Sequence, residues 1–87
     1  GSDAPAARIG EVGQLLSAIA GEIAGLGEVH DVRVRETADG EIVNFHCHVD
    51  PSLSVRAVHD LVDTVERGLR RHFPTVQRVI GHAEPRR

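Results

Sequence analysis

The sequence predicts one small α+β domain, a two-layer sandwich in which two helices cover one face of a three-stranded mixed sheet. Three observations predict it. Two stretches repeat apolar residues at helical spacing, three others alternate apolar and polar residues, and their order is helix, strand, strand, helix, strand. A hairpin followed by a helical crossover to a third strand gives a ferredoxin-like αββαβ arrangement. The 87 residues suffice for one such domain.

The first predicted helix spans residues 11–26, where apolar side chains recur every three or four positions. Its three glycines each weaken a helix by roughly 1 kcal/mol relative to alanine, so tertiary packing must hold it. Gly27 is the expected stop. Residues 1–10 are small and contain a proline, and we expect them to be a disordered segment. Its first two residues, Gly-Ser, look like a cloning scar.

Residues 28–36 and 41–50 predict a β-hairpin, since both stretches alternate and the Thr-Ala-Asp-Gly sequence between them is typical of a turn. In the second strand two sets of side chains point to opposite faces. The apolar set is Val43, Phe45, Cys47 and Val49, and the polar set is Asn44, His46, His48 and Asp50. The apolar set is expected to face the core.

The second predicted helix follows Pro51, which ends the hairpin, with Ser52 or Ser54 as its cap. It runs to about residue 72, where Phe73-Pro74 breaks it. Residues 75–83 then predict a last short strand. The domain is therefore expected over residues 11–85, with residues 86–87 as a tail.

Composition excludes several classes of function. The net charge is −3, so the Lys/Arg excess of a surface that binds nucleic acid or anionic lipid is missing. No apolar run approaches the ~20 residues of a membrane-spanning helix. The single cysteine cannot form an internal disulfide, which fits a reducing compartment. With no activated nucleophile and no Gly-rich phosphate loop, the chain is not expected to be an enzyme.

Residues 45–50, FHCHVD, are the first candidate for chemistry. His46 and His48 lie two apart on a strand, so both side chains point to the same face and could serve one metal ion or two adjacent ones, with Zn²⁺ the default. The alternative is a solvated strand face that happens to be polar. Cys47 between them faces the core and is a poor ligand. Counting outward from the turn, His30 is expected to pair roughly with His48, which brings three imidazoles together.

The remaining histidines are ambiguous from the sequence. His82 ends the last strand, and Glu84 shares its face by alternation. His59 lies beside the apolar stripe of the second helix, where a lone histidine is more often a surface residue than a ligand. His72 closes that helix, where the helix dipole favours a cation, so we interpret it as a cap.

Three stretches taken together resemble the cytoplasmic C-terminal domain of cation diffusion facilitator transporters. They are EVHDVRVRE, EIVNFHCHVDPSLSVRAVHDLVDTVERGLRRHFP and VQRVIGHAEP. The resemblance runs from about residue 10 to residue 85. Each piece alone is a weak signal, and all of them in order at matching spacing form a strong one. It implies a metallochaperone-like αββαβ domain that forms a homodimer.

The resemblance further implies a metal site near the dimer interface. Its ligand positions fall on His30, His46, His59, His82 and Glu84, and His48 stands where the family commonly has an acidic or apolar residue. Zn²⁺ is the expected ion, with Cd²⁺, Ni²⁺, Cu²⁺, Mn²⁺ and Fe²⁺ as alternatives. Metal would tighten the V-shaped dimer and so regulate efflux by the transmembrane domain of the same transporter. The full-length protein would lie in a membrane, for which the bacterial inner membrane is expected, with this domain at the cytoplasmic face.

Two other functions fit the same residues. One is a stand-alone soluble protein that buffers or delivers metal. The other is a dimerisation module that binds no metal and whose histidines are incidental.

Overall fold

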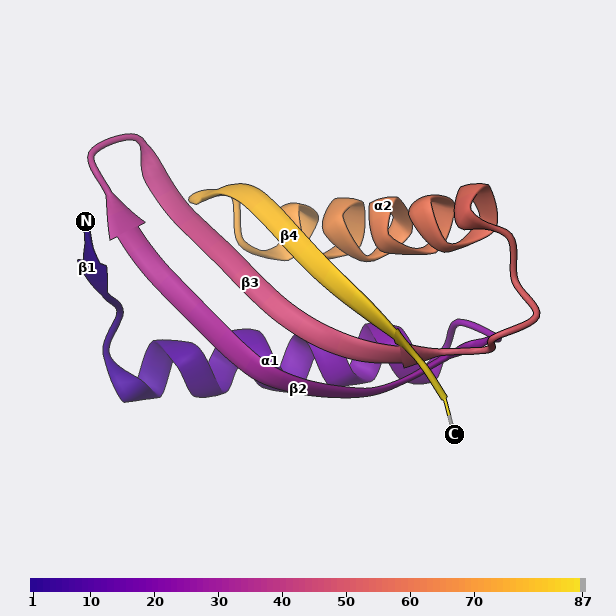
Figure 1. Cartoon of the computed structure of the whole chain (residues 1–87). Helices are drawn as coiled ribbons and strands as arrows, with labels where there is room; N and C mark the ends of the chain where they lie inside the picture. The colour runs from indigo at the N-terminus through magenta and orange to yellow at the C-terminus, as the bar shows by residue number, and fades with distance from the viewer. Residues whose placement is uncertain (87) are drawn as a thin grey trace.

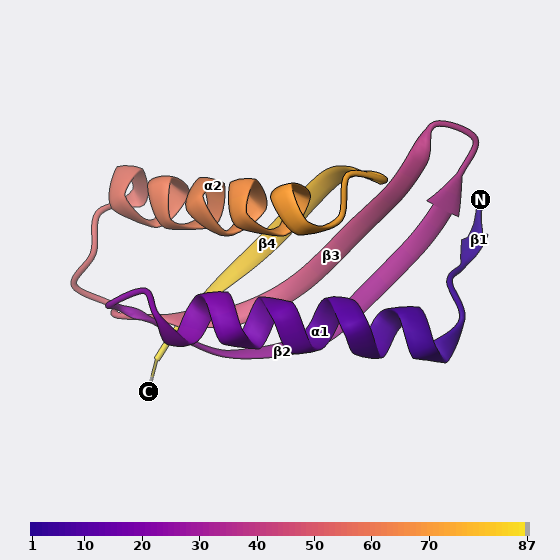
Figure 2. The same ribbon diagram turned by 180° about the vertical axis from the view of Figure 1, so that it is seen from behind.

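The computed structural model describes residues 1–86. Its elements are β1 (Ser2–Asp3), α1 (Ala6–Gly21), β2 (Leu26–Thr37), β3 (Gly40–Val49), α2 (Val55–His72) and β4 (Val76–Pro85). The strands form one sheet in the order β1-β2-β3-β4, antiparallel except where β3 pairs with β4 in parallel. Both helices lie against one face of this sheet (Figure 1), and the view from behind shows them in front of the strands (Figure 2).

The predicted α+β sandwich is confirmed, with one strand more than expected. The additional strand is β1, whose Ser2 and Asp3 pair with Glu36 and Arg35 of β2. The prediction of a disordered segment over residues 1–10 therefore differs from the structure, in which α1 already begins at Ala6. Pro5 directly precedes the first helical residue, and the alanines that follow it are strong helix formers. Arg87 of the predicted tail lies outside the described residues.

The end of the first helix was predicted five residues too late. α1 ends at Gly21, and Gly25 adopts a left-handed conformation with φ of 88°. Glycine reaches that region without a steric penalty, so the chain can turn there into β2. Leu26, assigned to the helix from its spacing, instead opens β2 and pairs with Val49. The other predicted boundaries lie within two residues of the observed ones, and the Ser54 side chain caps α2 by accepting a hydrogen bond from the Ala57 N–H.

The core lies between the helices and the inner face of the sheet. Val43, Phe45 and Cys47 of β3 have no exposed surface, and the residues between them are partly exposed. This confirms the predicted alternation. The fully buried partners from the helices are Val12, Leu16, Val65 and Leu69. Asn44, His46 and His48, which alternate with the buried residues of β3, lie on the face away from both helices.

Gly81 lets β4 pack tightly against its neighbours. It lies opposite Phe45 in the parallel register. A Cβ atom there would be 2.9 Å from both the Phe45 ring and a Val62 methyl group, closer than side chains tolerate. The absence of a side chain therefore allows the Phe45 ring to fit beneath β4. This contact fixes the strand segment that carries His82 and Glu84 beside β3.

Candidate metal centre

The face of the sheet that points away from the helices, called the open face below, carries the histidines in two rows across the strands. The first row is His30, His46 and His82, and the second is Gly27, His48 and Glu84, each from β2, β3 and β4 in turn. Neighbouring strands lie about 4.8 Å apart, so side chains in a row can touch. The His30 ring centroid is 5.6 Å from that of His46 and 5.4 Å from that of His48.

His30 reaches the open face because β2 is irregular. Near the turn Arg33 pairs with Asn44, and a regular ladder would then place His30 opposite Cys47, pointing into the core. A register shift between His30 and Arg33 places it opposite His46 instead. The predicted pairing of His30 with roughly residue 48 was therefore wrong for two reasons. The hairpin closes with Thr37 opposite Gly40, which makes Cys47 the regular partner, and the extra residues in β2 then move the partner to His46.

Two residues with left-handed backbone lie at these irregularities. Asp31 has φ of 50° and Glu28 has φ of 47°. Few residues other than glycine adopt this conformation, and aspartate and asparagine are several-fold enriched among those that do. The local sequence therefore supports the bulge that turns the His30 side chain outward.

Glu84 lies at the centre of the imidazoles. Its Oε1 atom is 3.3 Å from His30 Nε2 and 3.6 Å from His48 Nε2. Its Oε2 atom is 3.4 Å from His46 Nδ1. One carboxylate therefore contacts three imidazoles, which come from two different strands. All four side chains are partly exposed, so ions in solution can reach them.

A hydrogen bond from the Nδ1 atom fixes the orientation of the His30 ring. Its Nδ1–H donates a hydrogen bond of 2.9 Å to the Glu28 carbonyl. In the neutral ring this leaves the Nε2 lone pair directed at Glu84, which is how metal-binding histidines are commonly held. The same hydrogen bond, helped by the carboxylates of Glu84 and Asp31, raises the pKa of His30 above its ordinary value of 6.5.

These donor atoms fit a divalent transition metal ion. With metal–ligand bonds of about 2.0–2.2 Å, two ligands at a tetrahedral angle lie about 3.4 Å apart. The separations around Glu84 agree, at 3.3, 3.4 and 3.6 Å. Imidazole nitrogen with carboxylate oxygen is a donor set suited to Zn²⁺ and its neighbours in the first transition row.

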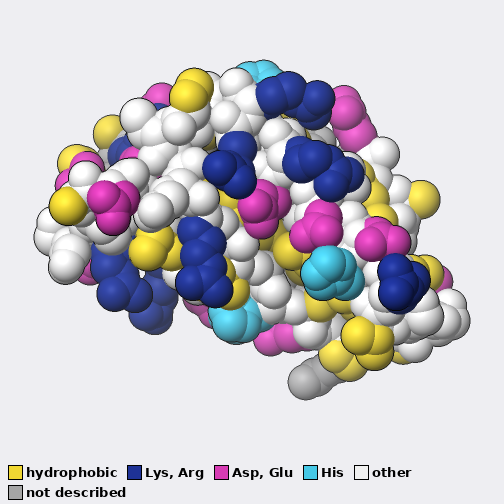
Figure 3. Space-filling model, turned by 90° about the horizontal axis from the view of Figure 1, so that it is seen from above, with side chains coloured by type: hydrophobic (Ala, Val, Ile, Leu, Met, Phe, Trp, Pro, Cys, Tyr) yellow, Lys and Arg dark blue, Asp and Glu magenta, His cyan; other side chains and the backbone are white. Residues whose placement is uncertain are grey.

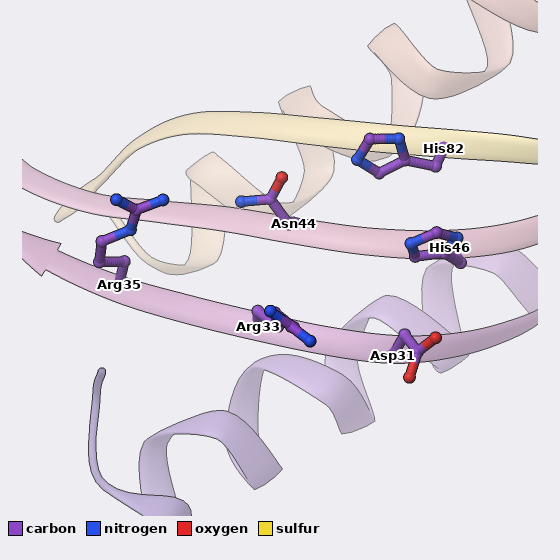
Figure 4. A pocket seen from close by; sticks show the side chains of 6 residues that line it. All are labelled: Asp31, Arg33, Arg35, Asn44, His46 and His82. Atoms are coloured by element: carbon purple, nitrogen blue, oxygen red, sulfur yellow. The ribbon is translucent and has the colours of Figure 1, made fainter. Parts of the chain in front are cut away.

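His82 and the arginines define the rest of the open face. A shallow hollow of about 250 Å³ is lined by Asp31, Arg33, Arg35, Asn44, His46 and His82. The His82 ring stacks on that of His46, with centroids 4.7 Å apart. Figure 4 shows the two imidazoles and Asp31 together, with Arg33 and Arg35 further along β2. The arginines repel cations, so a cation is favoured at the histidine end.

His59 is not brought to this centre within one chain. It lies on α2 with 72% of its side chain exposed, and its Nδ1 is 3.4 Å from Asp63 and 3.8 Å from Asp60. Seen from above, basic, acidic and histidine side chains are mixed on the solvent-facing side of the molecule (Figure 3). His59 therefore belongs to a separate local group, and the sequence had not singled out its two acidic neighbours.

Cys47 and His72 behave as predicted. Cys47 is fully buried, and this burial raises the pKa of its thiol, which disfavours the thiolate that a metal would need. His72 lies at the end of α2 with a ring nitrogen 3.3 Å from the Gly68 carbonyl oxygen, as expected for a cap. Neither residue lies on the open face beside the candidate ligands.

Two residues of the centre were missed from the sequence. The Glu28 carboxylate lies 2.9 Å from His48 Nδ1, and a carboxylate oxygen of Asp31 lies within 4.8 Å of nitrogens of His30 and His46. In a regular strand, Asp31 would point away from His30. The only available signal was that aspartate tolerates a left-handed backbone, which is too weak to locate a bulge.

We expect Asp31→Val to weaken Zn²⁺ binding more than Asp31→Gly does. Both variants remove the carboxylate, but only valine resists φ of 50°, at a cost of roughly 1–2 kcal/mol. Valine should therefore disturb both the bulge and the orientation of the His30 side chain. Calorimetric titration checks the affinity and thermal denaturation checks the stability. Equal affinities in the two variants would show that the bulge does not govern the site.

The chain matches the family described as cation efflux protein, cytoplasmic domain, over residues 10–86. The chain belongs to that family. The resemblance seen in the sequence is thereby confirmed, and with it the assignment to the cytoplasmic domain of a cation diffusion facilitator. No curated protein matches the chain by sequence. Neither helix within residues 1–86 has the length and hydrophobicity needed to cross a membrane.

Three solved structures share the fold. CzrB in its Zn form is 27% identical with a TM-score of 0.84, covering 98% of this chain and 92% of that chain. The metal-bound C-terminal domain of the CzcD transporter from Thermotoga maritima is 18% identical with a TM-score of 0.79, covering 94% of each chain. A variant of the MamM CTD in a zinc form is 20% identical with a TM-score of 0.77, covering 93% of this chain and 89% of that chain.

Proposed function

We propose that this domain is the metal-sensing regulatory part of a divalent cation efflux transporter and that its open face binds a Zn²⁺-type ion. The Glu84 carboxylate carries the proposal, because it lies 3.3 to 3.6 Å from nitrogens of three imidazoles. Family membership and the metal-bound forms of CzrB and CzcD support it.

The proposed ligands follow the family positions. His30, His46, His82 and Glu84 would hold the ion from the sheet, and His59 would join from α2. Because imidazoles predominate, Zn²⁺ is the expected ion. Ni²⁺, Cu²⁺ and Cd²⁺ fit the set better than Mn²⁺, which prefers oxygen ligands. When bound, the ion supplies positive charge and fixed ligand directions at this face.

A homodimer would make the site regulatory. The open face is free of helices among the described residues, so a second copy can approach it. Since His59 pairs with acids of its own helix, we propose that it reaches the sheet ligands of the other subunit. An ion that bridges two subunits stabilises whichever relative orientation binds it more tightly, and this would tighten the V-shaped dimer.

Without metal, protonated histidines on the two subunits would repel one another and loosen the dimer. In the full-length transporter, this change would pass to the transmembrane domain and adjust export from the cytosol. The proposal places that protein in a membrane, for which the bacterial inner membrane is expected, with this domain on the cytoplasmic side. The domain itself is proposed to have no catalytic role.

Small-angle scattering of the chain with and without Zn²⁺ tests the dimer. We expect Zn²⁺ to increase the dimer population and reduce the radius of gyration of the dimer. The variant His59→Ala should lose most of this change, whereas His72→Ala, a histidine at the far end of the same helix, should keep it. Identical scattering with and without Zn²⁺ would instead favour a metal-independent dimerisation module.

A further inference from the structure

We propose that His48 is a metal ligand in this chain and that Glu28 is the residue that positions it. The inference rests on the proposed function, because it concerns the same open face. It goes further in assigning a ligand at a position where related domains commonly carry an acidic or apolar residue. The ligand class is a divalent transition ion that prefers imidazole, such as Zn²⁺ or Co²⁺.

His48 shares a coordination point with His30. The two Nε2 atoms approach the same Glu84 oxygen, Oε1, at 3.6 Å and 3.3 Å. The three donor atoms lie within 4.8 Å of one another. They form a group of three protein ligands, which for a zinc ion leaves a further position for water or for another ligand.

His46 lies on the other side of the same carboxylate. Its Nδ1 contacts Glu84 Oε2, and its ring stacks on His82. His30 and His48 therefore share Oε1, whereas His46 contacts the other oxygen of the same carboxylate. Without His48, the Oε1 group would hold only one imidazole.

Glu28 fixes both imidazoles of the Oε1 group through their Nδ1 atoms. Its carboxylate lies 2.9 Å from His48 Nδ1, and its carbonyl accepts a 2.9 Å hydrogen bond from His30 Nδ1. The left-handed backbone at Glu28, with φ of 47°, accompanies this double contact. Partners on the distal nitrogen orient metal-binding histidines, and their loss typically costs about 10–100-fold in metal affinity.

An ordinary surface ion pair explains less of this geometry. Exposed pairs contribute about 0–1 kcal/mol and hold neither partner firmly. A pair between His48 and Glu28 would satisfy Nδ1 and would give no reason for Nε2 to face the Glu84 oxygen that His30 also faces. His48 is also the least exposed of these imidazoles, with 28% of its side chain accessible against 34% for His46 and 42% for His30.

The test is a calorimetric Zn²⁺ titration of the 87-residue chain, with Co²⁺ absorption as an independent readout. Relative to the wild type, His48→Ala should lose one bound ion per chain or at least about tenfold in Zn²⁺ affinity. A loss of that size is at least as large as the smallest effect expected from removing a residue that only orients a ligand. His48→Asn serves as a second variant in case alanine perturbs folding. His72→Ala is the control and should bind as the wild type does.

The positioning role of Glu28 is tested by a measurement that would not change if its side chain only stabilised the fold. We expect Glu28→Ala to lose about tenfold in Zn²⁺ affinity while the melting temperature of the metal-free domain stays unchanged, because the Glu28 side chain is 75% exposed. Glu28→Gln should recover part of the affinity, since its amide oxygen can accept a hydrogen bond at the same position beside His48 Nδ1.

The outcomes separate this inference from the proposed function. If the wild type binds Zn²⁺ and both His48 variants bind it with the same affinity and stoichiometry, His48 is not a ligand and the proposed function stands. If Glu28→Ala weakens binding while the His48 variants do not, the assignment of His48 is overturned. A wild type that binds no Zn²⁺ overturns both.

Discussion

Replacing Glu84 by glutamine is expected to lower Zn²⁺ affinity by more than about 100-fold, because residues that only orient a ligand already account for about 10–100-fold. The carboxylate contacts three imidazoles and supplies the anionic donor among them. Glutamine keeps the shape of the side chain and removes its charge. Calorimetric titration of the chain measures the loss directly.

The matched control is Glu11→Gln, which removes the same charge from an exposed position on α1. It should bind Zn²⁺ as the wild type does. If Glu84→Gln loses less than about tenfold, the carboxylate is not a ligand, since even an orienting residue is expected to contribute that much. The ion would then be held by imidazoles alone.

Zn²⁺ binding is expected to weaken at least about 100-fold between about pH 7.5 and about pH 5.5, because each ligand imidazole must release its proton before it binds metal. The pKa of His30 is raised above 6.5, chiefly by its hydrogen bond to the Glu28 carbonyl, so proton competition begins above that pH. Below its pKa, each such imidazole contributes about tenfold per pH unit.

The metal-free domain should show the opposite trend. A pKa that is higher in the folded state contributes stability below the ordinary value of 6.5, and this contribution is lost as the pH rises through the folded-state value. Thermal denaturation with and without Zn²⁺ across this pH range measures both trends. Stabilisation by Zn²⁺ that stays the same at about pH 5.5 and about pH 7.5 would exclude imidazole ligands.

Half of the candidate centre could be predicted from the alternation of buried and exposed side chains along β3. Because successive side chains on a strand point to opposite faces, the buried Phe45 and Cys47 imply that His46 and His48 lie together on the other face. That inference needs only neighbouring residues. It also explains why Cys47, the chain's only cysteine, could be set aside as core packing.

The partner residues on β2 were less predictable. Their register depends on irregularities near Glu28 and Asp31, two residues with left-handed backbone where a glycine or asparagine would have been the usual signal. Regular counting therefore misplaced His30 and hid both acidic side chains. The start of α1 and the short strand β1 were missed because residues 1–10 carry little apolar pattern.

His59 shows what a single chain cannot provide. The family resemblance assigns it as a ligand, yet the fold places it on α2 beside Asp60 and Asp63. No pattern in one chain can place a residue relative to a second copy. The role proposed for His59 therefore requires a second copy of the chain, whereas His30, His46 and Glu84 converge within one chain.

The central claim is that the open face binds a transition metal ion in the folded state, and thermal denaturation with added metal tests it most directly. At a Zn²⁺ concentration about 100 times the dissociation constant, binding should stabilise the domain by about 2.7 kcal/mol. For a domain of this size, that corresponds to a rise of roughly 10–20 °C in the melting temperature. Mg²⁺ at the same concentration should give no rise, since it prefers oxygen ligands. An equal melting temperature with Zn²⁺, with Mg²⁺ and without metal would contradict the claim.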